Sequence, residues 1–327
     1  MLNYIIRRLL YMLVTLVFVA IISFMLLDLT PGSYLDTEIA RLRQAGGNMS
    51  DGQIEALKIR YGVNDPFPLK FGKWIVGVLQ GDFGQSFEFS VPVSSLIWGR
   101  LAFSLILATS SIIFAWLISI PLGVYSATHR YTIPDYIITV LQFVGVAIPE
   151  FLIALVLMVV SASVFHADVG GLFSPAYVDA AWSGAKFVDF LKHVWIPIIV
   201  IGASSTAWLT RVMRANLLDV LNAQYVQTAR AKGLGEGLVI WKHAVRNALH
   251  PLIMAAGGIL PALISGEVIA SIVLNLPTTG PLFINALIKK DTYLAVAFLL
   301  LLSVMLVVGN LLADLALAWV DPRIRLE

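Results

Sequence analysis

Long apolar runs, separated by shorter polar connections, make up most of the chain. Six of these runs are long enough to cross a membrane as helices, and they cover residues 9–27, 101–128, 136–165, 194–210, 251–274 and 292–320. A helix needs about 20 apolar residues to cross the hydrocarbon core of a bilayer. The runs do not alternate apolar and polar positions, as the strands of a membrane barrel do. The pattern therefore predicts an all-α polytopic membrane protein with six transmembrane helices.

The composition is also that of a protein whose solvent is the bilayer. Of the 327 residues, 59% are hydrophobic and only 13% are charged, whereas about 25% of the residues of a soluble domain are charged. The chain contains no cysteine, which excludes disulfides and thiolate metal sites. Arg7 and Arg8 precede the first apolar run, as in a signal peptide, but this uncharged run is long enough to span. We therefore expect it to be a retained first span.

The basic residues of the short connections predict the orientation of the spans. If the N-terminus is cytoplasmic, the short outer connections hold only Lys186, Lys192, Lys289 and Lys290. The inner side then holds the larger set, which is Arg7, Arg8, Arg130, Arg211, Arg214, Arg230, Lys232, Lys242, Arg246, Arg323 and Arg325. Because short cytoplasmic connections carry an excess of Lys and Arg, we expect both termini to be cytoplasmic.

This topology divides the chain into three parts. Residues 1–30 hold the cytoplasmic N-terminus and the first span, residues 31–100 form a helical extracytoplasmic insert, and residues 101–327 hold the other five spans. Within the insert we expect a helix over residues 49–61, with Ser50 as its N-cap.

The cytoplasmic loop 211–250, between the fourth and fifth predicted spans, combines basic residues with helical periodicity. Apolar positions at three- and four-residue spacing predict one helix over 208–232 and a second over 238–249. Gly233 is placed to end the first helix, and Gly235 and Gly237 favour a sharp bend. By periodicity alone, such a segment is typical of basic amphipathic helices that lie on anionic lipid headgroups.

The order of residues in this loop is more specific than its periodicity. The run YVQTARAKG at 225–233 is followed by HAVRNAL at 243–249 and by Pro251. This order resembles the cytoplasmic coupling loop, or EAA loop, of ABC importer permeases, in the version found in dipeptide, oligopeptide and nickel importers. Further stretches resemble the same family in the same order, and they are YIIRRL at 4–9, LTPG at 29–32, GDFGQS at 81–86, NLLAD at 310–314 and DPRIR at 321–325.

The resemblance implies a permease subunit that forms half of a translocation pathway in a bacterial or archaeal inner membrane. In this family the short helix of the loop docks into a groove on an ATP-binding subunit. The matching positions here are Tyr225, Thr228, Ala229, Arg230, Ala231, Lys232, Gly233 and Leu234. Small Ala229 and Ala231 would allow the two backbones to approach closely.

The same resemblance implies the partners and the class of solute. The partners are a second homologous permease subunit, two ATP-binding subunits that hold ATP and Mg, and an extracytoplasmic solute-binding protein. Neither nucleic acid nor a cofactor on this chain is expected. The solute is a dipeptide or oligopeptide, and the alternatives within the family are an oligosaccharide or nickel.

Two stretches depart from the pattern of the family. LGEG at 234–237 stands where relatives usually carry a polar or basic run, and PTTG at 277–280 stands where they tend to have a Pro-Gly-Leu-Gly turn. Ser271 occupies a position where relatives tend to have an acid. Glu267 lies about one helical turn before Ser271, on roughly the same face of the helix.

Glu150 and Glu267 are acidic residues within predicted spans, where a charge is costly and marks a candidate functional site. Glu150 follows Pro149, and Glu267 lies in a span rich in small residues. Together with Ser271 they are the candidates for lining the translocation path, where they would favour a cationic or amine-bearing solute. The alternative for both carboxylates is hydrogen bonding between helices.

The sequence contains no recognisable catalytic or metal-binding motif. It lacks the GxxxxGK[ST] of a P-loop, so we expect ATP hydrolysis on partner subunits. Its five histidines lack paired-ligand spacing. A proton-coupled secondary transporter could use Glu150 and Glu267, but it would usually show inverted repeats, which we do not find. An intramembrane enzyme would need a motif such as GxSxG, which is also missing.

Overall fold

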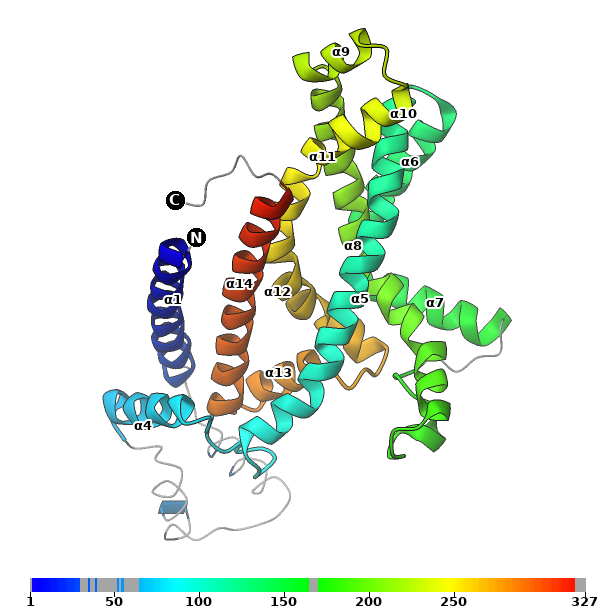
Figure 1. Ribbon diagram of the computed structural model, residues 1–327. Helices are drawn as coiled ribbons and strands as arrows, with labels where there is room; N and C mark the ends of the chain where they lie inside the picture. Colours follow the sequence, from blue (N-terminus) through cyan, green and yellow to red (C-terminus); the bar gives the residue numbers. More distant parts are fainter. Residues whose placement is uncertain are drawn as a thin grey trace. The chain divides into compact units, whose positions relative to one another are not determined.

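The computed structural model describes residues 2–29, 65–164 and 170–320, together with positions 35, 39, 52, 54 and 55 (Figure 1). The named elements in these ranges are helical, and one isolated antiparallel bridge pairs Gln85 with Pro92. Most of the predicted helix over 49–61, with its Ser50 cap, lies outside the described residues, as do most of the LTPG stretch and the DPRIR tail.

The helices in chain order are α1 (Leu2–Asp28), α4 (Phe67–Leu79), α5 (Val93–Thr128), α6 (Ile133–Ala147), α7 (Glu150–Val164), the short η1 (Pro175–Tyr177), α8 (Gly184–Leu221), α9 (Gln224–Ala231), α10 (Glu236–Leu238), the π-helical turn η2 (Val239–Ala244), α11 (Val245–Ala248), α12 (His250–Val273), α13 (Thr279–Ile288) and α14 (Thr292–Val320). They form two compact units. The first comprises residues 1–4, 103–277 and 305–327, and the second comprises residues 5–102 and 278–304.

Four of the described helices are long and apolar enough to cross a membrane, namely α1 over Ile6–Asp28, α5, α8 and α14 over Thr292–Ala318. If α6 and α7 form one bent span, it is the fifth. The predicted run 251–274 coincides with α12, which is helical over His250–Val273, although part of its side chains lie outside the described residues. The polytopic, all-helical prediction is therefore confirmed for the described ranges, and the count of six spans stays a prediction.

The run predicted as one span over 136–165 is broken at Ile148 and Pro149. The two resulting helices, α6 and α7, are bent by 105° relative to each other. Proline has no N–H to donate to the preceding turn, and it disfavours helical geometry in the residue before it. Ile148 is accordingly extended, with φ −82° and ψ 125°. As a result Glu150 is the first residue of a new helix rather than part of a continuous one.

Helix α8 is central to the packing of the first unit, where it contacts α6, α7 and α12 (Figure 1). Small residues let its neighbours approach closely. A Cβ added at Gly145 on α6 would lie 2.9 Å from the Cβ of Ala207, and a Cβ added at Gly123 on α5 would lie 2.7 Å from that of Met213. Close contact at small residues is how helices associate in a membrane, where lipid removes the hydrophobic driving force between them.

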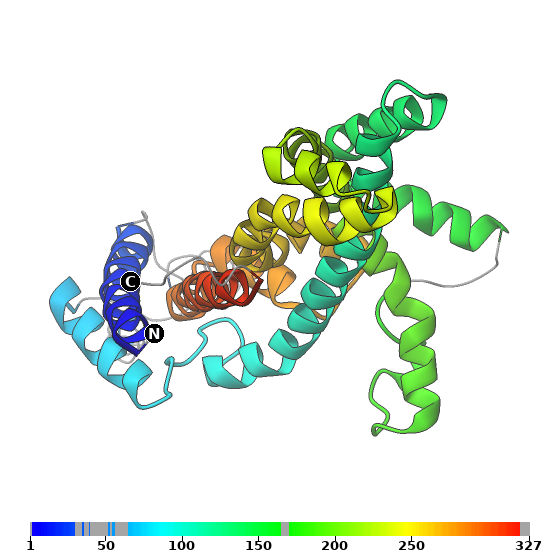
Figure 2. The same cartoon turned by 45° about the horizontal axis from the view of Figure 1, so that its top comes forward.

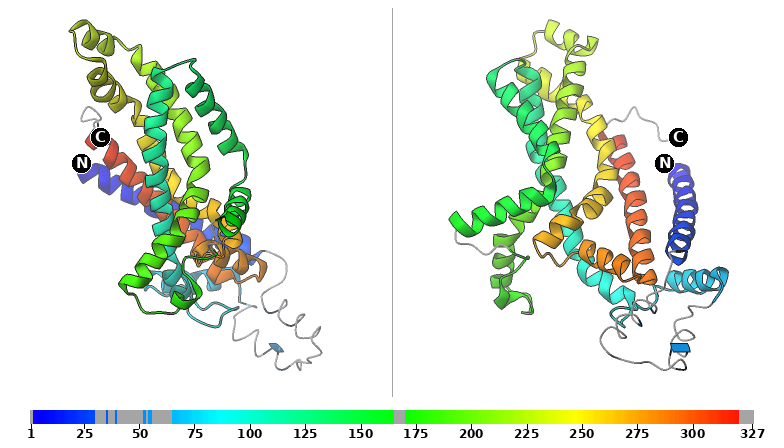
Figure 3. Two further views of the ribbon diagram at one scale, coloured as in Figure 1. Left: turned by 90° about the vertical axis from the view of Figure 1, so that its right-hand side faces the viewer. Right: turned by 180° about the vertical axis from the view of Figure 1, so that it is seen from behind.

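In the second unit, one end of α1 lies next to α4 (Figure 3), and an aromatic cluster joins the two helices. Phe24 of α1 is 1% exposed. The rings around it, at centroid distances between 5.5 and 6.2 Å, are those of Phe67, Phe71, Trp74 and Tyr293. An ion pair of 2.7 Å between Lys70 and Asp28 holds the end of α1 against the same helix. Side-chain packing and one charge pair therefore fix α4 on α1.

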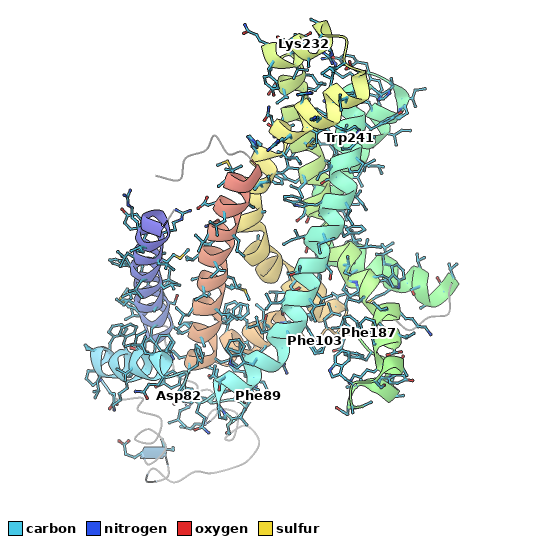
Figure 4. All side chains as sticks on the ribbon, viewed as in Figure 1. Asp82, Phe89, Phe103, Phe187, Lys232 and Trp241 are labelled. Atoms are coloured by element: carbon cyan, nitrogen blue, oxygen red, sulfur yellow. The ribbon has the colours of Figure 1, made fainter. Side chains whose placement is uncertain are left out.

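The GDFGQS stretch of the same unit is attached to the start of α14 through Asp291. This buried carboxylate accepts hydrogen bonds from Ser86 Oγ at 2.5 Å and from the backbone N–H of Glu88 at 3.2 Å. Figure 4 labels Asp82 and Phe89, which flank the attached segment. Burial raises the pKa of Asp291 above its ordinary value, although the hydrogen bond from Ser86 opposes this shift.

Candidate functional site

The helix predicted over 208–232 is interrupted in the structure at Asn222 and Ala223. The last turn of α8 is tightened by bonds from Asn222 N to Asp219 O at 3.2 Å and from Ala223 N to Val220 O at 3.0 Å. Ala223 is then extended, with φ −68° and ψ 144°, and α9 begins at the next residue. The prediction of a single helix was wrong, because the spacing of apolar residues continues across the break although the helical backbone conformation is interrupted there. The predicted docking residues thus begin on a separate short helix.

Helix α9 has one face inside the protein and one face outside. Val226 and Ala229 are 0% and 6% exposed, and they pack in a cluster with Leu217 of α8 and with Val239 and Ala244 of η2. The predicted docking residues that are exposed are Tyr225, Thr228, Ala231, Lys232, Gly233 and Leu234. Figure 4 shows Lys232 at the tip of this region and Trp241 on its flank. Of the two small alanines, only Ala231 is therefore on the surface available to a partner.

Gly233 ends the first helix of the loop, as predicted. Its φ is +77°, a conformation that glycine adopts at little cost. The backbone N–H of Gly233 donates to Arg230 O at 2.9 Å, and that of Leu234 donates to Ala229 O at 3.4 Å. These bonds satisfy carbonyl groups at the end of α9. The corner that follows is therefore a defined turn, in which Gly235 is the N-cap residue of α10.

An ion pair crosses this corner. Arg230 Nη2 lies 2.6 Å from Glu236 Oε1, and Arg230 Nη1 also donates to the carbonyl of Leu221, the last residue of α8, at 3.4 Å. The hydrogen bonds from Arg230 hold the pKa of Glu236 below its ordinary value, and the same contact raises the pKa of Arg230. The guanidinium of Arg230 thus connects the last turn of α9 to the end of α8 and to the start of α10.

The second predicted helix, over 238–249, is helical in the structure but not uniformly α-helical. Residues Val239–Ala244 form a π-helical turn, and α11 follows directly. Asn247 Nδ2 of α11 donates to the hydroxyl of Tyr225 on α9 at 2.6 Å. Figure 2 shows the yellow-green and yellow segments that hold α9, α10 and α11 grouped together, and η2 contacts all three of these helices. Packing and hydrogen bonds therefore join α9 to both flanking helices, so that it can move with them.

The candidate path residues lie on helices that contact one another, since α7 packs against α8 and α12, and α8 packs against α12. Glu150, at the start of α7, accepts a hydrogen bond from Ser204 Oγ of α8 at 2.7 Å. Glu267 and Ser271 are fully buried on α12. The sequence left two roles open for Glu150, namely lining the path and hydrogen bonding between helices. The bond from Ser204 is a hydrogen bond of the second kind.

A cluster that we did not predict lies between α5, α6 and α8. Asp135, 2% exposed in the first turn of α6, accepts hydrogen bonds from Ser126 and Arg214. The sequence placed Arg214 only among the basic residues that set orientation. Asp135 and Arg214 are separated by 79 positions, and a single sequence carries no signal that would have paired them.

Comparison with known proteins covers nearly the whole chain. The family described as "Binding-protein-dependent transport system inner membrane component" matches residues 119–326, and its N-terminal companion matches residues 1–108. The chain is 38% identical to the oligopeptide transport system permease protein AppB of Bacillus subtilis, with 98% of each chain covered. It is 34% identical to a putative peptide permease protein of Brucella ovis and 32% identical to the glutathione transport system permease protein GsiC of Salmonella paratyphi A, with 99% of each chain covered. The protein therefore belongs to the family of multi-pass inner-membrane permease components of binding-protein-dependent ABC importers.

Proposed function

We propose that this chain forms half of the translocation pathway for a dipeptide or oligopeptide in an ATP-driven importer. The similarity to transport proteins of named solutes supports this most directly. The relatives are named as permeases for oligopeptides, peptides and glutathione, and the similarity extends over almost their entire length. All three named solutes are compounds with peptide bonds. The other half of the pathway is a second homologous permease, and an extracytoplasmic binding protein delivers the solute.

The proposed topology has six spans, with α12 as the fifth and both termini in the cytoplasm. The excess of Lys and Arg in the connections at that side supports this orientation. The loop between α8 and α12 is then cytoplasmic. Two ATP-binding subunits, which hold ATP and Mg, drive the transport cycle from that side.

The ATP-binding subunit contacts the exposed face of α9 and the turn after it, through Tyr225, Thr228, Ala231, Lys232 and Leu234. The inward face of the same helix, with Val226 and Ala229, packs on the protein's own core. Arg230 and Gly233 act from within the loop, by bracing the corner and by ending the helix. This division suits a coupling element. A helix that contacts a partner on one side and packs on its own protein on the other transmits a displacement of the partner to the helices that it packs against.

For the path we propose Glu150, Glu267 and Ser271, on the mutually packed helices α7 and α12. A peptide carries an ammonium group at its N-terminus, and a carboxylate in a low-dielectric path attracts that charge more strongly than it would in water. To test this, uptake by Glu150→Gln and Glu267→Gln is measured with a free peptide and with its N-acetylated form. We expect KM to rise for the free peptide and to stay constant for the acetylated one. Unchanged kinetics for both peptides would leave the two carboxylates as interhelical contacts.

The docking surface is tested with one substitution at two sites. Ala231→Trp adds bulk to the exposed face of α9. Ala181→Trp is the control, and it adds the same bulk at an exposed position just before α8 begins at Gly184. We expect Ala231→Trp to lose the ATP-binding subunit on purification and to lose uptake, while Ala181→Trp keeps both. Retention of the ATP-binding subunit and of uptake by Ala231→Trp would contradict docking at α9.

The solute is identified separately, by mass spectrometry of the ligand that co-purifies with the cognate binding protein. A peptide is the expected ligand. An oligosaccharide or a nickel complex would reject the peptide assignment but leave the permease role intact.

A further inference from the structure

Asp135 joins three separate segments of the first unit. Its carboxylate accepts hydrogen bonds from Ser126 in the last turn of α5, from the backbone N–H of Tyr131 at 3.0 Å, and from Arg214 of α8. Tyr131 lies in the short turn between α5 and α6 and has a φ of +62°, which is uncommon for a residue with a side chain. The carboxylate therefore stabilises an unusual turn as well as a contact between helices.

Arg214 binds this carboxylate with two nitrogen atoms. Its Nε and Nη2 each lie 3.0 Å from an oxygen of Asp135, and Nε also lies 2.9 Å from Ser126 Oγ. A planar guanidinium that binds a carboxylate at two points fixes orientation as well as distance. A rotation or a slide of α8 against α6 would break one or both bonds, so the pair resists such motion more than apolar packing would.

The pair lies close to the element that meets the ATP-binding subunit. Arg214 is about two helical turns before Leu221, where α8 ends and the chain continues into α9. The adjacent residue Met213 is completely buried and packs against α5 at Gly123. Near its cytoplasmic end, α8 is therefore attached to α5 by close packing and to α6 by an ion pair.

We propose that Asp135 and Arg214 are positioning residues for coupling, which carry the displacement of α8 to the hairpin formed by α5 and α6. The proposal rests on the function proposed above, in which the ATP-binding subunit moves α9. The displacement then reaches α5 and α6 as well as the two helices that the loop connects directly. Without the ion pair, α8 would move while the hairpin lagged behind it, and ATP hydrolysis would proceed without transport.

The test uses the assembled importer in proteoliposomes, with uptake and ATP hydrolysis measured on the same preparation. Asp135→Asn and Arg214→Gln remove the charges, and Asp219→Asn and Arg211→Gln are matched controls at exposed positions of α8. We expect all four variants to retain the ATP-binding subunits. Uptake per ATP hydrolysed should fall about tenfold in the first two variants and stay constant in the controls. Arg214→Lys keeps the charge but not the two-point contact, so its uptake per ATP hydrolysed should lie between the values of the parent and of Arg214→Gln.

A purely structural role would lower the amount of assembled complex without changing uptake per ATP, and that result would overturn the proposal. Loss of the ATP-binding subunits from Asp135→Asn and Arg214→Gln would also overturn it. A parent complex without any ATP-binding subunit would instead reject the proposed function itself, so the two failures can be told apart.

Because the chain has no cysteine, a covalent replacement of the ion pair is a second, independent test. The double variant Asp135→Cys/Arg214→Cys is prepared in a complex whose other subunits lack reactive cysteines, and it is treated with a short reagent that joins two thiols. We expect the unbridged protein to show a low uptake per ATP and the bridged protein to recover most of the parent value. A confirmed bridge that leaves the ratio low would refute a mechanical connection between α8 and α6.

Discussion

Gly123 of α5 lies so close to Met213 of α8 that a Cβ added to the glycine would be 2.7 Å from two side-chain atoms of the methionine. Gly123→Ala should therefore force the two helices apart. We expect a loss of about 1–3 kcal/mol in the free energy of unfolding, as is typical of overpacked interiors. Unfolding in detergent micelles, followed by circular dichroism, measures this loss.

The same helix supplies the control for this substitution. Gly99 of α5 has open space around its Cβ position. Gly99→Ala should be neutral or should stabilise the protein by up to about 1 kcal/mol, because alanine favours helix more than glycine does. Equal effects at the two glycines would show that close approach at Gly123 does not limit the packing of α5 on α8.

The aromatic cluster of the second unit predicts a large cost for truncating Phe24. Phe24→Ala removes the ring that contacts α4, and we expect a destabilisation of about 3–5 kcal/mol, because the cavity it leaves is only partly refilled. Phe18→Ala, at a position on the same helix that is 61% exposed, should change stability by no more than about 0.5 kcal/mol. The melting temperatures of both variants and of the parent protein measure this difference. Similar melting temperatures for Phe24→Ala and Phe18→Ala would contradict a stabilising role of the aromatic cluster.

The ion pair across the corner after α9 predicts a loss of local order in acid. The pKa of Glu236 is lowered in the folded protein by hydrogen bonds from Arg230. The stabilisation is therefore present above the unfolded value of about 4.3 and is lost as pH falls through the lower folded value. Amide hydrogen exchange in residues 230–236, corrected for intrinsic rates, should accelerate in that range. Glu236→Gln should exchange at the faster rate already at neutral pH, and an unchanged rate in this variant would exclude the ion pair as the cause.

Asp291 predicts a pH dependence of the opposite sign. Burial raises its pKa in the folded protein, so protonation favours the folded state. Its contribution is fully present below the unfolded value of about 3.9 and is lost as pH rises through the raised folded value. Exchange at the backbone N–H of Glu88, corrected for intrinsic rates, should therefore be slower in mild acid than at neutral pH. Asp291→Asn cannot titrate and should show no such dependence; if it retained one, another group would be responsible.

Long apolar runs predicted most of the helical architecture, because a segment of that length and composition can satisfy its backbone groups in lipid only as a helix. The same runs concealed the bend at Pro149, since an apolar sequence continues through a change of direction. In the loop 211–250, Gly233 was predictable as a helix end because a positive φ such as its +77° strongly favours glycine. The break at Asn222 and Ala223 was not, because nothing in the spacing of apolar residues changes there.

Tertiary pairing is the part of the site that the sequence could not supply. The inward orientation of Ala229 depends on cores built from η2 and α8, and the pairing of Asp135 with Arg214 depends on the packing of α6 against α8. Both facts require the helices to be placed in space. Residue order could nominate the loop as functional, but only the fold separates its exposed residues from those that hold the loop together.

The π-helical turn Val239–Ala244 gives the loop between α8 and α12 one place where its length can change at little structural cost. A π-helical turn holds one residue more than an α-helical turn does. Deletion of a single residue within it would leave an ordinary α-helical turn and keep the flanking helices in phase. The same deletion within α11 would rotate every later residue of α12 by about 100° and turn Glu267 away from its present surroundings. Insertions and deletions accumulated over evolution should therefore be tolerated in this turn and excluded from the helix that follows it.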